Sequence, residues 1–117
     1  MKIAPAVSLA AALLCASAAL AQTTAIPVPS DPRARYTLVS QSGSSGGLEV
    51  VTRRSGSSGV SYTRRQINCR QMSFRYLGEG DTLEQAMTSA NADRTMGPLV
   101  EGSISYHVAV FACRRAG

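Results

Sequence analysis

Few side chains in this sequence are of the types that carry out acid–base or nucleophilic chemistry. His107 is the only histidine among the 117 residues, and no nucleophile is placed for it to activate as a general base. Glu79 and Asp81 could be a carboxylate pair for glycan cleavage, which needs two acids across a bound substrate. Two nearby loop acids in so short a chain leave no room for a substrate cleft. The sequence therefore predicts no enzymatic activity and no catalytic residue.

The motif Gly78-Glu79-Gly80 is a fragment of a glycine-rich loop. It lacks the third glycine of a dinucleotide site and the lysine of a phosphate-binding loop, so it predicts a turn from a strand to a helix. We expect no cofactor.

Two cysteines, Cys69 and Cys113, form an isolated pair in the C-terminal part of the chain. In an exported protein such a pair is typical of a disulfide. A metal site or a reactive thiol is the alternative, but the chain has no CxxC motif and a single histidine, so we expect no metal. In the chain-entropy model, a disulfide that closes a loop of this length stabilises the fold by about 4 kcal/mol.

The basic residues are almost all arginine. The formal net charge is +5, and Lys2 is the only lysine, so the other eleven of the twelve basic residues are arginine. Codon usage in a GC-rich genome is one explanation. The other is an anion-binding surface, because a guanidinium group can donate two parallel hydrogen bonds to a carboxylate or a phosphate. The candidate binding residues are Arg53, Arg64 and Arg75.

Strand geometry limits how these arginines can act together. They occur in part as doublets, namely Arg53-Arg54, Arg64-Arg65 and Arg114-Arg115. Neighbouring residues in a strand point to opposite faces of the sheet, so at most one member of each strand doublet can join a given patch.

The N-terminal segment 1–21 has the pattern of a cleaved secretory signal peptide. A basic start is followed by an apolar stretch and by Ala19-Leu20-Ala21, which has the small residues of a cleavage site. An uncleaved anchor is one alternative, because the apolar stretch approaches the roughly 18 residues that can span a bilayer. A lipid-modified Cys15 is another, although the preceding Leu14 is larger than such processing requires. With the signal removed, we expect no transmembrane span.

The remaining chain divides into a leader and one domain. Residues 22–35 contain three prolines and few large apolar residues, which predicts an extended, poorly ordered leader. Residues 36–117 are long enough for a single domain with one modest core.

The stretch SGSSG occurs twice, at residues 42–46 and 55–59. A flexible linker is possible by composition, but the β-branched runs on either side favour two hairpin turns of an antiparallel meander. If the second turn is symmetric about its middle residue, Glu49 lies opposite Arg65 and Val50 lies opposite Arg64.

The second half of the domain predicts two more strands and a helix. Residues 71–77 alternate between apolar and polar side chains, as in a half-buried strand. A helix is expected over 81–92, with Asp81 as its N-cap, Glu84 completing a capping box, and an end before Gly97-Pro98. Residues 103–113 alternate in the same way as a central strand. The fold class is therefore α+β, an antiparallel β-meander of about five strands with one amphipathic helix and one disulfide.

The chain resembles the bacterial surface-adhesin protein E-like families. The resemblance spans about residues 36–113 and is carried by an arginine-bearing meander, a cysteine followed by RQMSFRYLGEGD, and the closing VAVFAC. It implies a small envelope protein, built of a sheet and a helix, that contacts other macromolecules.

These features predict a binding module in the periplasm, at the cell surface or secreted. The expected partner is acidic, either an envelope protein or an anionic glycan or lipid surface, because the exported domain is basic. The alternative is a periplasmic inhibitor or accessory subunit that inserts an SGSSG loop or residues 78–81 into an envelope enzyme. Nucleic acid is not expected, because a signal peptide directs the chain away from it. The sequence leaves the oligomeric state open.

Overall fold

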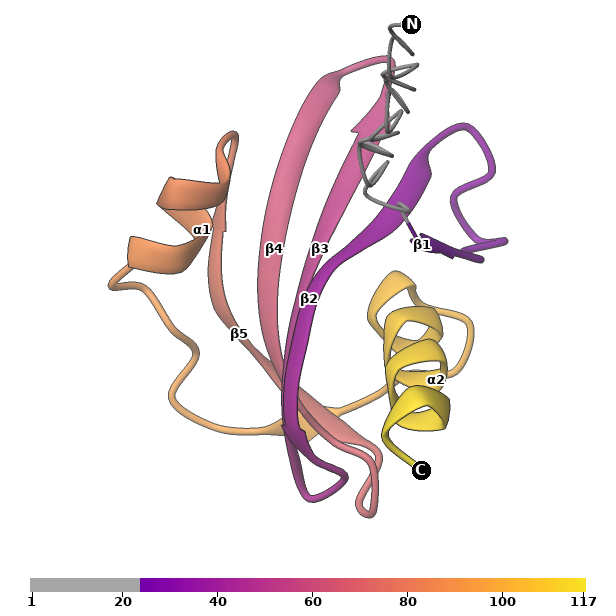
Figure 1. The fold of residues 1–117 in the computed structure, drawn as a ribbon, viewed down its shortest axis with the longest axis vertical. Coiled ribbons are helices and arrows are strands. Elements are labelled where there is room, and N and C mark those ends of the chain that lie inside the picture. The colour runs from indigo at the N-terminus through magenta and orange to yellow at the C-terminus, as the bar shows by residue number, and fades with distance from the viewer. Residues whose placement is uncertain (1–23) are drawn as a thin grey trace, which may run out of the picture.

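The computed structural model of the protein describes residues 24–117 as an antiparallel sheet with one helix on each side (Figure 1). The six strands follow one another across the sheet in chain order. They are β1 (Thr24–Ile26), β2 (Arg35–Ser44), β3 (Gly47–Gly56), β4 (Gly59–Asn68), β5 (Ser73–Gly80) and β6 (Gly97–Pro98). The helices are α1 (Leu83–Thr88) and α2 (Ile104–Ala116). The predicted α+β class and antiparallel meander are confirmed. The predicted signal segment 1–21, with Cys15, lies outside the described residues.

Both SGSSG stretches form tight hairpin turns, as expected. Ser45 and Gly46 connect β2 to β3, between the paired residues Ser44 and Gly47. The second turn, at 57–58, connects β3 to β4 between paired glycines. One of these, at position 59, has a φ of +111°, which favours glycine because that residue has no Cβ.

The predicted register of β3 and β4 is wrong by one residue. The turn has two residues and is centred between 57 and 58, whereas the prediction assumed a centre on residue 57. Glu49 therefore pairs with Gln66, and Val50 pairs with Arg65. Directly paired residues of two strands point to the same face of a sheet. Because Val50 is in the core, its partner Arg65 also points toward α2.

The main core lies between α2 and the sheet. Strands β3 and β4 contribute Leu48, Val50 and Ile67, all at most 1% exposed. The helix contributes Val108 and two alanines, all fully buried. The alanines at 109 and 112 let the helix backbone approach the sheet closely.

The prediction of a central strand over 103–113 is wrong, because these residues form α2. Ser103 caps the helix by accepting a hydrogen bond from the backbone N–H of Tyr106 at 3.2 Å. The buried residues are Ser105, Val108, Ala109 and Ala112, which have the i, i+3, i+4, i+7 spacing of one helix face. Burial of this face outweighs the β-preference of the isoleucine and valines. In the described part of the chain, neither α1 nor α2 is long and apolar enough to cross a membrane.

The first helix is shorter than predicted and is capped differently. Its N-cap is Thr82 rather than Asp81, and the capping box is completed by Gln85 rather than Glu84. The helix ends at Thr88, so the predicted extent to residue 92 is wrong. Ala86 is its only buried residue, because the short helix crosses the end of β5 instead of covering a whole face.

The segment predicted as a poorly ordered leader contributes to the domain from residue 24 onward. Thr24–Ile26 pairs with β2 as an edge strand, while Ile26 and Val28 are in the core at 4% and 8% exposed. The prolines break the strand pairing after Ile26 but do not prevent these apolar side chains from packing. The structure thus differs from the expectation over residues 24–34.

Candidate functional site

The three arginines predicted to bind a partner share one face of the sheet. Adjacent strand residues alternate between faces, and Arg65 points toward α2, where it contacts Ser105. Arg64 therefore points to the other side, where it contacts Ala86 of α1. The same alternation and the strand register place Arg53 and Arg75 beside it.

Arg35 of β2 also lies on this face, because its neighbour Tyr36 is buried on the α2 side. We call the four residues Arg35, Arg53, Arg64 and Arg75 the arginine face. Among the residues of β2 to β5 that point to this side, Glu49 is the single acid. The strands thus carry an excess of positive charge on one surface.

Arg64 has a structural role within this face. Its Nη1 is 3.1 Å from Glu49 Oε1, and its Nε donates to the carbonyl oxygen of Ala86 at 3.2 Å. Nη2 is 3.5 Å from the carbonyl oxygen of Leu77. These contacts attach α1 to the sheet and neutralise much of the charge of Arg64.

Arg75 is also engaged within the domain. Its Nε donates to Gln66 Oε1 at 2.6 Å, and its Nη1 donates to the carbonyl oxygen of Asp93 at 3.0 Å. No acidic side chain pairs with it within residues 24–117. It keeps its net charge, but its position is fixed by the loop after α1.

Arg35 and Arg53 are the members that are available to a partner. Neither side chain makes a hydrogen bond or an ion pair with residues 24–117. Arg53 pairs with Thr37, two positions beyond Arg35 in β2, so the two arginines are diagonal neighbours on one face. Such neighbours have Cβ atoms about 7–8 Å apart, a spacing that two anionic groups on one polymer can match.

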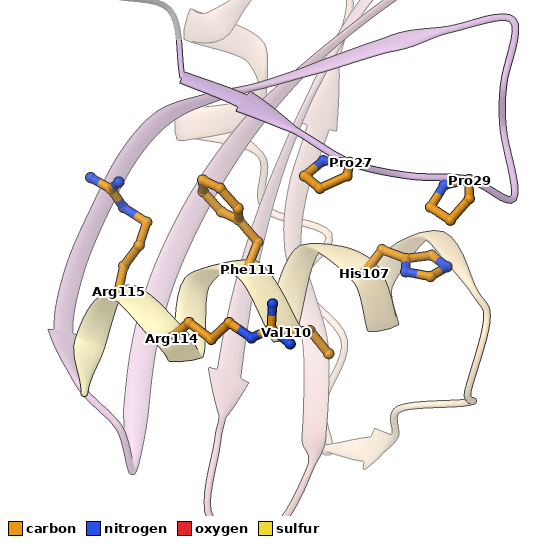
Figure 2. A pocket seen from close by; sticks show the side chains of 7 residues that line it. All are labelled: Pro27, Pro29, His107, Val110, Phe111, Arg114 and Arg115. Atoms are coloured by element: carbon orange, nitrogen blue, oxygen red, sulfur yellow. The ribbon is translucent and has the colours of Figure 1, made fainter.

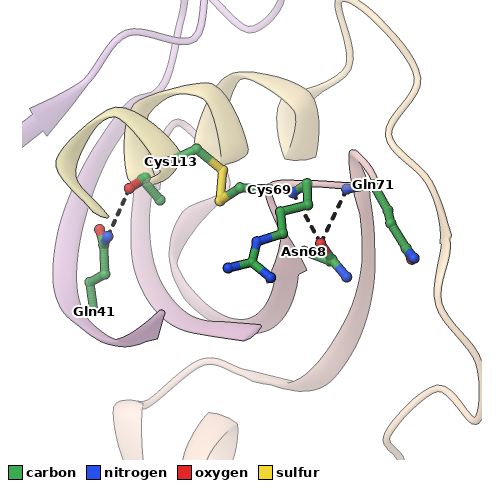
Figure 3. The surroundings of a disulfide bond; sticks show 7 residues. Gln41, Asn68, Cys69, Gln71 and Cys113 are labelled. Carbon is green, nitrogen blue, oxygen red and sulfur yellow. Dashed lines mark hydrogen bonds between the residues drawn. A yellow bond between two sulfur atoms is a disulfide. The ribbon is translucent and has the colours of Figure 1, made fainter. Parts of the chain in front are cut away.

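The predicted disulfide between Cys69 and Cys113 is confirmed, with a Cα–Cα distance of 5.7 Å (Figure 3). It joins the turn after β4 to the last turn of α2. The backbone N–H of Cys69 donates to Ser45 O at 2.7 Å, and Gln41 Nε2 donates to Ala112 O at 2.8 Å. The bridge therefore fixes the C-terminal end of the helix against two turns of the sheet.

An open groove of about 430 Å³ runs between α2 and the segment after β1 (Figure 2). Its lining is mainly apolar and includes Val110 and Phe111 of α2 and Pro27 and Pro29 of the segment after β1. His107 lines one end and packs edge to face against Tyr106, with ring centres 5.5 Å apart. The arginines at 114 and 115 line the other end, and the guanidinium carbon of the second is 5.6 Å from the centre of the Phe111 ring.

A hydrogen-bonded cluster connects the segment after β1 to the sheet. The Tyr36 hydroxyl donates to Asp31 Oδ2 at 2.7 Å, and Arg54 Nε donates to the same oxygen at 3.0 Å. The bond from Tyr36 and then that from Arg54 lower the pKa of the Asp31 carboxyl below its ordinary value of 3.8. Burial and then the bond to Asp31 raise the pKa of Tyr36.

Arg65 is a buried guanidinium group, only 4% exposed. Its Nε donates to Ser105 Oγ at 3.0 Å and its Nη1 to Thr52 Oγ1 at 2.9 Å. Tyr76 lies beneath it, with the ring centre 5.5 Å from the guanidinium carbon. Burial lowers the pKa of Arg65.

The residues considered for catalysis are dispersed in the structure. Glu79 lines a cavity beside Arg65, whereas His107 lines the groove on the other side of α2. Asp81 is exposed, and its backbone N–H donates to Gln85 Oε1 at 2.8 Å. Within residues 24–117, no three His, Cys, Asp or Glu side chains are grouped so that they could hold a metal ion.

Sequence reasoning missed Arg35, Arg65 and Phe111 as surface or cavity residues. The doublet Arg64-Arg65 contained the signal for Arg65, because one of two strand neighbours must point to the inner face. Arg35 was assigned to the leader, and Phe111 was assigned to a strand. Their positions depend on elements that the sequence did not identify.

Comparison of the chain with protein-family models, with curated proteins and with solved structures gives no match. The resemblance to the surface-adhesin protein E-like families stays a prediction.

Proposed function

We propose that the protein is a non-catalytic binding module of the cell envelope that contacts an acidic macromolecule through the arginine face. The observation that carries the proposal is the pair Arg35 and Arg53, which are on one face and whose side chains make no hydrogen bond or ion pair within residues 24–117. Unpaired guanidinium groups at this spacing can bind sulfate, phosphate or carboxylate groups along a polymer.

Export to the envelope rests on two further features. The Cys69–Cys113 disulfide is compatible with an oxidising compartment, where such bonds form and persist. The pattern of residues 1–21 is that of a secretory signal.

The proposal is tested with two double variants that change the net charge equally. One is Arg35→Glu with Arg53→Glu, which reverses the free part of the arginine face. The control is Arg70→Glu with Arg94→Glu, because both of these arginines are exposed and lie outside the arginine face. Arg64 and Arg75 are left intact, because their side chains hold the fold together.

Binding is measured against heparin and lipopolysaccharide, with neutral dextran as the uncharged comparison. The face variant is expected to lose at least about tenfold in affinity, or 1.4 kcal/mol, while the control loses much less. Wild-type affinity should fall as salt screens the exposed charges. Equal losses in both variants would show that net charge alone drives binding and would contradict the proposal.

A second candidate, an accessory subunit of an envelope enzyme, is favoured by the groove along α2. The apolar lining that includes Val110 and Phe111 is suited to an apolar side chain from a protein partner. The SGSSG turns are too short to insert deeply, since each has only two residues between its paired strands. Under this candidate, Phe111→Ser prevents co-purification of one stoichiometric enzyme, and the arginine-face variant does not.

A further inference from the structure

Arg65 is a buried cation without an acidic partner. It donates to the hydroxyl groups of Ser105 and Thr52 and lies over the ring of Tyr76, and neither ion pair of the described residues includes it. Buried charges in proteins are ordinarily paired, because desolvation is costly. The positive charge of Arg65 is therefore not balanced by an ion pair within residues 24–117.

The buried guanidinium group lines a cavity of about 220 Å³. Five other residues that line this cavity carry hydroxyl groups, namely Tyr36, Thr52, Ser61, Thr63 and Tyr76. The cavity therefore places an unpaired positive charge among hydroxyl-bearing side chains.

The charges around the cavity favour a single negative charge on the ligand. Arg54, which also lines it, is neutralised by Asp31 at 3.0 Å. Glu79 lies in the cavity wall, and its charge partly opposes the effect of burial on Arg65. A dianion such as phosphate would add a second charge next to Glu79, whereas a carboxylate adds one.

The cavity size and its lining define the rest of the ligand. Drug-sized molecules occupy pockets of about 300–1,000 Å³, so the space here suits a smaller molecule. Its wall of hydroxyl groups can exchange hydrogen bonds with hydroxyl substituents. Ile104 in the first turn of α2 closes one side, where the positive end of the helix dipole also favours an anion.

We propose that this cavity is a binding site for a small hydroxylated monocarboxylate, such as a free sugar acid, with the carboxylate on the guanidinium group of Arg65. The site lies on the α2 side of the sheet, opposite the arginine face. It is therefore independent of the binding proposed above, and either proposal can fail without the other.

The test is an NMR titration of the ¹⁵N-labelled protein with sodium glucuronate at constant ionic strength. Glucose and inorganic phosphate are the comparison ligands. Saturable shifts are expected for the Arg65 Nε–Hε signal and for the amides of Thr52, Thr63 and Tyr76. Glucose and phosphate should bind at least about tenfold more weakly.

Two variants locate the site, and a third is the control. Arg65→Lys keeps the charge but removes the fork of the guanidinium group, and we expect at least a tenfold loss of affinity. Thr63→Val removes one lining hydroxyl group without touching the contacts of Arg65, and a loss of severalfold is expected. Arg94→Gln, at an exposed arginine outside both the cavity and the arginine face, should leave the affinity unchanged.

Three results would overturn the proposal. They are the absence of saturable shifts up to about 10 mM glucuronate, equally tight binding of phosphate, and shifts confined to the arginine face. If Arg65→Lys does not fold, the wild-type shift map and Thr63→Val still decide the question.

Discussion

Arg64 and Arg65 are neighbours in β4, yet they bind the two helices on opposite sides of the sheet. Arg64 Nε donates to Ala86 O of α1 at 3.2 Å, and Arg65 Nε donates to Ser105 Oγ of α2 at 3.0 Å. The two residues thus connect the sheet to α1 on one face and to α2 on the other. A substitution at one of them should loosen one helix and leave the other in place.

Arg64→Ala is expected to loosen α1 and to lower the free energy of unfolding by about 1–3 kcal/mol, because Ala86 O and Leu77 O lose a donor. Hydrogen exchange of the α1 amides should accelerate, while that of α2 should not. Arg53→Ala is the control and should change stability by less than about 0.5 kcal/mol. Equal effects of the two substitutions would contradict the structural role of Arg64.

Gly78→Ala is expected to displace α1 from β5. A Cβ at this position would collide with the carbonyl oxygen of Ala86, which is backbone and cannot move away alone. Overpacking of this kind costs about 1–3 kcal/mol, measurable by urea unfolding. Gly97→Ala is a matched control, because its Cβ would have no atom within 4 Å. A neutral result at position 78 would mean that α1 does not pack there.

Asp31→Asn is expected to remove a pH-dependent part of the stability. The pKa of Asp31 is lowered in the folded protein, so its contribution is complete above the ordinary value of 3.8 and is lost as the pH falls through the folded value. The unfolding midpoints of the two proteins should therefore differ at neutral pH and converge once the pH is below the lowered pKa of Asp31. A difference that stays constant down to about pH 2 would exclude this linkage.

Reduction of the Cys69–Cys113 bond should lower the free energy of unfolding by about 2–5 kcal/mol. Urea unfolding with and without a reducing agent measures the loss. A double variant with alanine at both cysteines should match the reduced protein and should not respond to the reducing agent. Unchanged unfolding after reduction would show that α2 is held by its packing alone.

The meander was predictable because local signals define it. The two SGSSG turns and the alternating residues 71–77 specify strand ends and faces without reference to the rest of the chain. The disulfide was predictable because only one cysteine pair remains after the N-terminal segment.

The helix α2 could not be identified with the same rules. Ile104, Tyr106, Val108 and Val110 alternate as in a strand, while Ser105, Val108, Ala109 and Ala112 have helical spacing. The period of a strand and the period of a helix thus occur in the same short stretch. Which of the two structures forms depends on packing against the sheet. The small residues of the helical pattern carry little hydrophobic signal in the sequence.

The sequence predicts which arginines of the candidate site lie on the same face of the sheet. It does not predict which hydrogen bonds their side chains make. The alternation of strand residues indicates which arginines can lie together, as for Arg53 and Arg75. It does not show that Arg75 is fixed by Asp93 O or that Arg64 supports α1, because these contacts depend on how the segment after β5 folds back.

The strand order has a consequence for loop closure during folding. Every strand pairs with its neighbour in the chain, and turns of two residues at 45–46 and 57–58 close the first two long hairpins. Because each of these turns is short, closing its hairpin has a small loop-closure cost. The Cys69–Cys113 bond instead joins residues 44 positions apart. It therefore adds a long-range covalent link between the sheet and α2, whereas each strand pairing joins adjacent strands of the chain.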